Sequence, residues 1–181
     1  MKKYCAFLRG VNVNGTSMKM AEVSKVFTEA GMKDVISVLA TGNIIFSSDK
    51  NRADLKIILE KSLSEFFNYE AFLFLKTEKE VVEIFEQNPF LKSEDSHIYI
   101  FVGIENIEHL LSEEFNQSIK SENENGTIVN RTFYWQVSKG NTLDSNFGKV
   151  LGKKSLKEKM TSRNLNTIEK IIKKFNTQQL I

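Results

Sequence analysis

The 181-residue chain is poor in the residues that form disulfides and metal centres: it contains one cysteine, two histidines and one proline. A single cysteine cannot form an internal disulfide, and its scarcity fits a reducing compartment, so we expect a cytoplasmic protein. His97 and His109 lie far from Cys5 in the sequence, without the short ligand spacing that is typical of a zinc site. We therefore expect no bound metal.

Long hydrophobic runs are also missing. No apolar stretch approaches the ~20 residues that span a bilayer, so we expect no membrane partner. The stretch after Met1-Lys2-Lys3 is apolar, but Arg9 interrupts it too early for the core of a signal peptide, which favours a strand. Cys5 lies inside this stretch and is expected to be a small buried hydrophobe, because reactive thiols need an accessible, electropositive setting.

Recognisable catalytic machinery is absent as well. Neither histidine lies in the context of a Ser-His-Asp triad, and no nucleophile elbow occurs. The glycines at positions 10 and 15 match neither the Walker A pattern nor the dinucleotide fingerprint, so we expect no cofactor. An enzyme of unknown reaction stays open as an alternative.

Hydrophobic periodicity indicates an α+β fold with two halves. In residues 1–76 it predicts the order β-α-β-β-α-β, with Ser17 and Asn51 as helix N-caps and Gly31 as a C-cap. The expected strands are 4–8 with Val11, 35–39, 44–46 and 71–75, and the expected helices are 18–30 and 52–67. This order is typical of a ferredoxin-like unit, in which helices cover one face of an antiparallel sheet.

Residues 77–181 predict a second, less regular α+β subdomain that packs against the first and ends in a basic helical segment. A capping box at Thr77–Glu80 opens a helix that ends before Pro89. The remaining expected elements are a strand at 97–102, a helix at 104–115, strands at 118–122 and 127–130 around an Asn125-Gly126 turn, a strand at 132–137, and helices at 144–154 and 165–175. The seam is expected near residues 75–78, and one interpretation of this half is a diverged copy of the first.

Three segments are together rich in Asn, Thr, Arg and Gly, a composition that is typical of binding an anion or a backbone rather than of acid–base catalysis. They are Tyr4–Gly15, Thr41–Asn43 and Thr161–Thr167. Glycine-rich loops between a strand and a helix can present backbone N–H groups to a phosphate. The predicted ligand-binding residues are Arg9, Asn12, Lys19, Asn43, Arg163 and Asn164. This hypothesis requires the three segments to meet in space; the alternative is structural, with tight turns and with Asn164 or Asn166 capping the last helix.

Charge is distributed unevenly along the chain. Residues 149–174 carry nine basic and two acidic side chains, whereas residues 78–125 carry three basic and twelve acidic ones. Such a basic segment can mark a phosphorylated small molecule or a nucleic acid as partner, and the alternative is a solvated surface paired with the acidic middle of the chain. Tyr99 and Tyr134 are the only aromatic residues placed to stack on bases, with burial in the core as their alternative. The oligomeric state is left open.

Several of these residues carry a resemblance to domain-of-unknown-function family 1697, which is bacterial. The matching segments are Leu8–Val13, Gly15, Lys19, Met20–Val23, Gly31–Val35, Thr41–Phe46 and Thr161–Thr167. The resemblance implies two α+β halves related to the ferredoxin-like fold, and it implies no established activity. Thr41 stands where the family usually has serine, and Leu165 where it usually has tryptophan.

Overall fold

The computed structural model describes residues 1–13 and 16–177, and only the backbone of residues 12, 13, 16 and 17. Contacts divide the chain into two units. The first comprises Met1–Val82 and Glu169–Ile181, and the second Glu83–Ile168. The boundaries fall inside helices α3 (Glu78–Glu86) and α6 (Leu165–Thr177), beyond the seam expected near residues 75–78.

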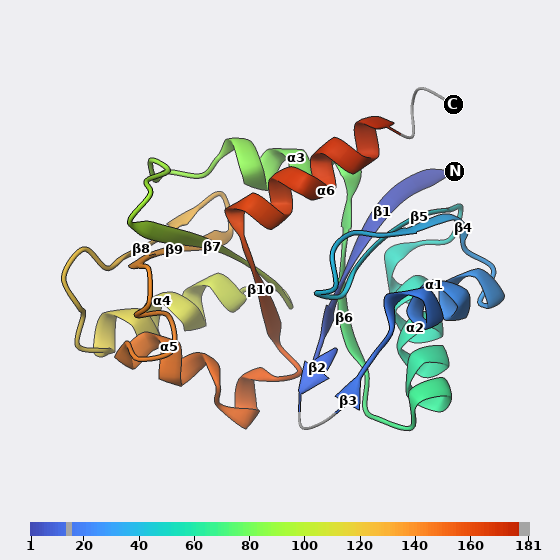
Figure 1. Cartoon of the computed structure of the whole chain (residues 1–181), viewed down its shortest axis with the longest axis horizontal. Helices are drawn as coiled ribbons and strands as arrows, with labels where there is room; N and C mark the ends of the chain where they lie inside the picture. The colour runs from blue at the N-terminus through green and yellow to red at the C-terminus, as the bar shows by residue number, and fades with distance from the viewer. Residues whose placement is uncertain (14–15, 178–181) are drawn as a thin grey trace. The chain divides into compact units, whose positions relative to one another are not determined.

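The first unit is built on a four-stranded antiparallel sheet (Figure 1). Its strands are β1 (Lys2–Arg9), β4 (Lys33–Ser37), β5 (Asn43–Ser48) and β6 (Phe72–Thr77), in the spatial order β4-β5-β1-β6. Helix α1 (Met20–Glu29) connects β1 to β4, and α2 (Arg52–Phe67) connects β5 to β6. A short hairpin of β2 (Asn12–Val13) and β3 (Thr16–Ser17) precedes α1. Apart from this hairpin, the predicted order β-α-β-β-α-β is confirmed.

Local signals define the ends of both helices. Asn51 caps α2 as predicted, because its Oδ1 accepts the backbone N–H of Asp54 at 2.9 Å. Gly31 follows the C-cap of α1, Ala30, and has a φ of 88°. The next N–H, that of Met32, donates to the carbonyl of Phe27 at 3.0 Å, which is a Schellman motif. The predicted cap at Ser17 is wrong, because that residue belongs to β3 and the helix begins later.

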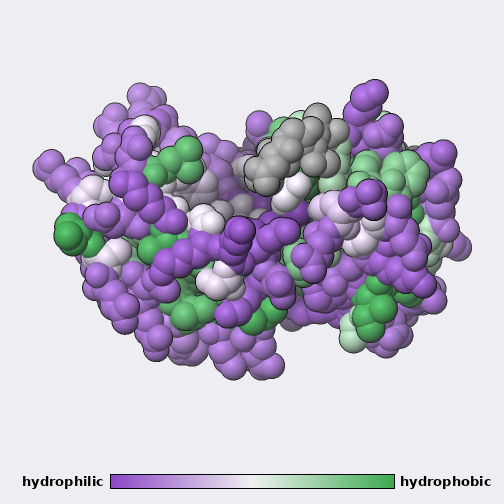
Figure 2. All heavy atoms as spheres, turned by 90° about the horizontal axis from the view of Figure 1, so that it is seen from below, coloured by the Kyte–Doolittle hydropathy of each residue, from purple (hydrophilic) through white to green (hydrophobic). Residues whose placement is uncertain are grey.

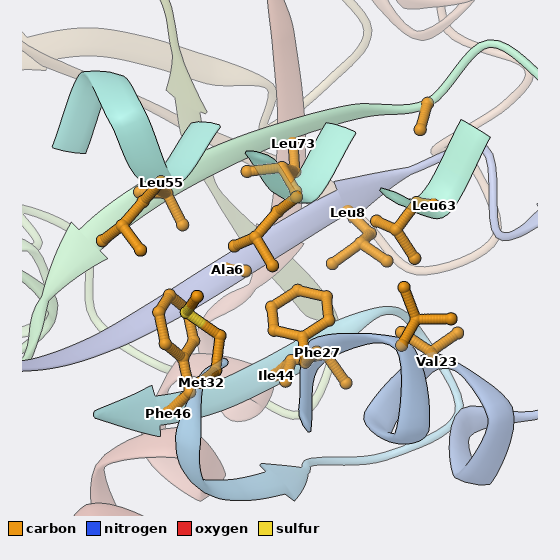
Figure 3. Packing of buried hydrophobic residues seen from close by; sticks show 14 of the residues in the cluster. Ala6, Leu8, Val23, Phe27, Met32, Ile44, Phe46, Leu55, Leu63 and Leu73 are labelled. Atoms are coloured by element: carbon orange, nitrogen blue, oxygen red, sulfur yellow. The ribbon is translucent and has the colours of Figure 1, made fainter. Parts of the chain in front are cut away.

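The core of the first unit lies between its sheet and its two helices. Ala6 and Leu8 of β1 lie in one cluster with Phe27 of α1 and Leu63 of α2, and Leu8 lies beside Leu63 (Figure 3). The side chains of β1 that face the other way are buried too, and Cys5 has no exposed surface. Burial on both faces explains why β1 is almost continuously apolar in sequence.

The second unit repeats this arrangement. Its strands are β7 (Ser96–Gly103), β8 (Asn125–Val129), β9 (Thr132–Ser138) and β10 (Met160–Asn164), in the spatial order β10-β7-β9-β8. Helix α4 (Ile107–Gln117) connects β7 to β8, while α5 (Asn146–Leu151) and a 3-10 turn, Lys154–Leu156, connect β9 to β10. In both sheets the first strand in the chain lies between the third and the fourth. This shared topology supports the interpretation of the second half as a diverged copy.

Each unit contains a stacked aromatic pair, and the two pairs show which positions of the units are equivalent. Tyr4 of β1 stacks on Phe46 of β5, with ring centroids 5.6 Å apart and an interplanar angle of 22°. Tyr99 of β7 stacks on Trp135 of β9 at 5.4 Å and 30°. In each unit the two rings face each other directly across the first and third strands. Tyr4 and Tyr99 therefore occupy equivalent positions.

The hairpin turn predicted at Asn125-Gly126 is wrong, as is the strand expected at 118–122. Both residues of the expected turn lie within β8, and the chain reverses at Asn130-Arg131, with φ values of 43° and 63°. Two successive left-handed residues are the requirement of a type I′ turn, which asparagine tolerates. A Cβ on Gly126 would lie 2.8 Å from ring atoms of Phe115 and Phe133, so this glycine serves close packing.

In the second unit, one strand was not predicted. Strand β10 is mostly polar and lies at the edge of its sheet, so it lacks the apolar pattern of the other strands. Among the helical residues, Ile171 of α6 is buried and Ile172 is partly buried, while Phe66 of α2 is 48% exposed.

The described surface is mainly hydrophilic. On the face drawn in Figure 2, hydrophobic residues form separate patches among hydrophilic ones. Leu91 and Leu143 are the most exposed of the large hydrophobic side chains described. Within residues 1–13 and 16–177, no helix has both the length and the apolar character needed to cross a membrane.

Candidate functional site

Four of the predicted ligand-binding residues lie in the first unit. Arg9 ends β1 and is half-buried, and this burial lowers the pKa of its guanidinium. Lys19 is exposed at the N-cap position of α1. Asn12 lies in β2, and its side chain is outside the described residues. Asn43 begins β5 and is completely buried.

The 41–43 turn lies against the end of β1. The backbone N–H of Leu8 donates to the carbonyl of Gly42 at 2.8 Å. A Cβ on Gly42 would lie 2.5 Å from Cγ2 of Val11, and its φ is 73°, so the turn requires glycine there. The amide of Asn43 donates to the carbonyl of Val38 at 3.0 Å. A buried amide engaged in this way fits the structural alternative, in which Asn43 holds the turn closed.

The third segment, 161–167, belongs to the second unit, and its convergence with the other two segments remains a prediction. Arg163 lies in β10 and is 7% exposed. Its Nη1 donates to Oγ1 of Thr161 at 2.7 Å and to the carbonyl of Ser162 at 2.8 Å. Oδ1 of Asn164 accepts the backbone N–H of Asn166 at 2.9 Å, so the alternative of a helix cap is confirmed.

Asn164 also lines a pocket that lies wholly within the second unit, with a volume of about 90 Å³. Its lining comes from the segment before β7, the beginning of β7, the residue after β9, the end of β10 and the beginning of α6. The lining residues are Lys92, Ser93, Ser96, His97, Ile98, Lys139, Asn164, Leu165 and Asn166. Among these described residues none is acidic, and most can donate hydrogen bonds.

His97 and Asn164 are joined directly. Nδ1 of the His97 ring lies 3.1 Å from Nδ2 of Asn164. The ring also contacts Tyr99 edge-on, with centroids 6.0 Å apart. His97 is therefore held on one side by the last strand and on another by its own strand, as expected of a satisfied residue at a strand end.

The position equivalent to Asn164 in the first unit is Thr77. Each pairs, in the last strand of its sheet, with the tyrosine of the stacked pair: Thr77 with Tyr4, and Asn164 with Tyr99. Each also immediately precedes a helix: α3 begins in the first unit, and α6 begins in the second. The two helix beginnings can therefore be compared residue by residue.

In the first unit this helix beginning is closed by a carboxylate. Glu80 accepts the backbone N–H of Thr77 at 2.7 Å and Nη2 of Arg52 at 2.5 Å, so the predicted capping box is confirmed. Burial by itself raises the pKa of Glu80, but the hydrogen bonds from Arg52 and Thr77 and the charge of Arg52 outweigh it and lower the pKa. The negative charge is thus stabilised in place.

In the second unit no acid takes this role. The first turn of α6, all of it described, contains no acidic residue. Thr167 stands three positions after Asn164, where the first unit has Glu80. The pocket with its two lysines opens beside this turn.

The two tyrosines considered for base stacking are both engaged in the protein. Tyr134 has no exposed surface, its hydroxyl donates to the carbonyl of Ile84 at 2.9 Å, and burial raises its pKa to about 12. Tyr99 is half-buried and stacked on Trp135. Neither matches the exposed aromatic platform that single-stranded RNA requires.

A lysine of the basic segment 149–174 pairs with the acidic middle of the chain. Nζ of Lys153 lies 3.0 Å from the carboxylate of Glu114. Lys173 instead pairs with Glu169, one turn earlier in α6. Both pairs fit the alternative of a solvated surface.

Of these pocket-lining residues, the sequence analysis named Asn164 as a ligand-binding candidate, and it did not name Lys92, His97 or Lys139 as such. They come from three separate segments that only the pairing of β7 with β9 and β10 brings together. The one available signal was the lack of an acid after Asn164, in contrast to the capping box at Thr77–Glu80.

Comparisons with known proteins agree with this fold. The chain is similar to the conserved bacterial protein SP0830 from Streptococcus pneumoniae, with a TM-score of 0.75 and 20% sequence identity over 96% of this chain and 99% of that one. No curated protein matches the chain. A family model matches residues 1–134. The chain therefore belongs to the family described as a protein of unknown function, DUF1697.

Proposed function

We propose that the pocket beside Asn164 binds the phosphate group of a phosphate-bearing ligand. The observation that carries this proposal is the lining itself: Lys92 and Lys139 supply positive charge, and His97 and the asparagine side chains add donors. The unprotonated oxygens of a phosphate accept hydrogen bonds, and charge-assisted bonds to them are among the strongest in proteins. Of the residues predicted from the sequence, the proposal uses Asn164.

The size of the pocket favours one small anionic group. Its volume of about 90 Å³ is well below the ~300–1,000 Å³ that is typical of sites enclosing a drug-sized ligand. The remainder of a larger ligand would then lie outside the pocket. Leu91, next to Lys92 in the sequence and 88% exposed, offers an apolar contact there.

Nucleic acid, the other predicted partner, is less well supported. Binding of single strands normally combines a basic groove with aromatic platforms, and both Tyr99 and Tyr134 are engaged inside the unit. A backbone phosphate could still meet the two lysines of the pocket. Short oligonucleotides therefore belong in the test beside inorganic phosphate.

The test is a calorimetric titration of the full chain with inorganic phosphate. Replacing Lys139 with alanine should weaken binding by about tenfold, because a charge-assisted hydrogen bond contributes roughly 1.5–3 kcal/mol. Lys170→Ala is the matched control, since Lys170 is an exposed lysine outside the pocket, and its affinity should equal that of the wild type. Equal loss in both variants, or no saturable binding by the wild type, would reject the proposal.

The oligonucleotide arm separates the two partners. A phosphate-bearing small molecule should compete with inorganic phosphate, whereas a short RNA or DNA should show no shift at low salt. A shift that weakens steeply with added salt would instead favour nucleic acid, because binding to the phosphate backbone releases counterions.

A further inference from the structure

The orientation of the Asn164 side chain is set by the backbone of α6. Its Oδ1 accepts the N–H of Asn166 at 2.9 Å, and a backbone N–H can only donate. The carbonyl end of the amide must therefore face Asn166. The other end, an NH₂ group without acceptor capacity, faces Nδ1 of His97 at 3.1 Å.

This orientation decides the protonation of the neutral His97 ring. Because the NH₂ of Asn164 can only donate, Nδ1 of His97 has to accept, and the ring proton then resides on Nε2. The charged groups that line the pocket around the ring are Lys92, from the segment before β7, and Lys139, at the end of β9. Both are cations, and neither can accept a hydrogen bond from the ring.

We infer that Asn164 fixes His97 as an Nε2–H donor, and that His97 is a specificity-determining residue that donates to an anionic oxygen of the ligand. The inference rests on the proposed function of the pocket and names the class of group it takes: the unprotonated oxygens of a phosphomonoester or an equivalent tetrahedral oxyanion. Asn164 is then a positioning residue that acts through His97.

The arrangement also bears on chemistry at this site. A ring whose Nε2 carries the proton is neither a base nor a nucleophile at that atom, since both roles need its lone pair. Ligands that would present an amine or an amide N–H to His97 meet a donor and are disfavoured.

The tautomer can be measured directly. Long-range ¹H–¹⁵N correlation spectra of the imidazole rings distinguish Nε2–H from Nδ1–H, and the chain contains only two histidines. At about pH 8, where an ordinary histidine is neutral, His97 should show the Nε2–H pattern. His109, whose side chain is 68% exposed on α4, serves as an internal reference in the same spectrum.

Two substitutions of Asn164 separate positioning from capping. Asn164→Ser keeps an oxygen that can cap α6 but removes the NH₂ donor. We expect His97 to become a mixture of tautomers and phosphate affinity to fall by about threefold, with little change in melting temperature. Asn164→Asp places an acceptor at Nδ1, so the ring should switch to Nδ1–H and phosphate affinity should fall further.

Substitutions of His97 test the donor itself. His97→Gln keeps an amide N–H near the place of Nε2 and should retain most of the phosphate affinity, whereas His97→Ala should lose about tenfold. Equal losses in both variants would overturn the assignment of His97 as a donor.

Failure of this inference and failure of the proposed function are distinguishable. An Nδ1–H pattern in the wild type, or an unchanged tautomer in Asn164→Ser, would overturn the positioning role of Asn164 whatever binds. Absence of phosphate binding by the wild type would overturn the proposed function and the ligand class, although the spectra would still decide what Asn164 does to His97.

Discussion

The helices that follow the two sheets begin at equivalent residues but are completed differently. At Thr77 the chain supplies its own anion, because the Glu80 carboxylate binds the backbone N–H and Arg52. At Asn164 the side chain caps the helix, and no acidic residue follows in the first turn, which is described in full. There His97, Lys92 and Lys139 line a pocket beside the helix beginning instead.

This difference shows that two units of the same topology can differ in the chemistry of one helix beginning. Both units have the same strand order and an equivalent stacked tyrosine, so their architecture does not depend on what happens at this helix beginning. In the first unit an internal carboxylate, that of Glu80, binds the backbone N–H at the helix beginning. The equivalent region of the second unit has no carboxylate in the first turn of α6, and Lys92 and Lys139 line the pocket beside it. An anion from outside the chain can stabilise a helix beginning of this kind.

The largest effect is expected where the two cores differ in packing. Gly126 directly precedes Thr127, which pairs with Tyr134 of β9. In the first unit Val35 directly precedes Ile36, which pairs with Ile45 of β5, the equivalent of Tyr134. Gly126→Val would give the second unit the residue of the first, against the rings of Phe115 and Phe133. We expect a loss of about 2–3 kcal/mol in the free energy of unfolding, because overpacking a filled core costs this much. Urea denaturation measures it.

Gly126→Ala serves as the graded control and should cost about 1–2 kcal/mol, since its Cβ alone would already meet both rings at 2.8 Å. If the alanine variant unfolds at the wild-type urea concentration, Gly126 is not needed for packing. The packing of the two cores would then be more alike than the structure indicates.

The next effect concerns the anion at the helix beginning. Thr167→Glu would introduce into α6 the acid that Glu80 provides in α3, and its carboxylate should reach back to the backbone N–H of Asn164. We expect phosphate affinity to fall by about tenfold, equivalent to ~1.4 kcal/mol, because the added negative charge lies beside the pocket. Calorimetric titration with inorganic phosphate measures the change.

Thr167→Gln is the matched control, because glutamine can complete the same capping box without a charge. Its phosphate affinity should stay near that of the wild type. If Thr167→Glu binds phosphate as tightly as Thr167→Gln does, the correspondence between the two helix beginnings has no bearing on ligand binding.

Much of the fold could be predicted because its signals are local. The span of α2 and the cap at Asn51 follow from the periodicity of Leu55, Leu59 and Leu63 and from one side-chain preference. The turn in the second unit could not be predicted this way. Asparagine precedes glycine at 125–126, but the space required by Phe115 places that glycine inside a strand.

The site was less predictable, because its parts meet only through strand pairing. Asn164 carried a local signal as a helix cap, but Lys139 is isolated in sequence and gains meaning only where β9 ends beside β7. Asn43 was also predicted to bind a ligand, as part of an Asn-bearing turn, and its side chain is buried in that turn. Residue type alone does not separate an asparagine that faces a pocket from one that holds the backbone.

The Glu80 carboxylate at the beginning of α3 should also make the stability of the protein depend on pH. The pKa of Glu80 is lowered in the folded chain, because the contributions of Arg52 and Thr77 outweigh burial. A group with a lowered pKa stabilises the fold above its unfolded value, which is ~4.3 for glutamate, and this contribution is lost as the pH falls through the folded pKa. The second unit has no such group at the equivalent residue, Thr167.

The smallest expected effect therefore comes from Glu80→Thr, which copies the residue of the second unit. Removing the capping carboxylate should cost about 1 kcal/mol at pH 7. Because Glu80 becomes protonated in acid, the difference in melting temperature between the variant and the wild type should shrink as the pH falls below about 4. Glu65→Thr, at an exposed glutamate of α2, is the control and should show little change at either pH. If the difference in melting temperature between Glu80→Thr and the wild type stays the same in acid, the charge of the Glu80 carboxylate does not stabilise the beginning of α3.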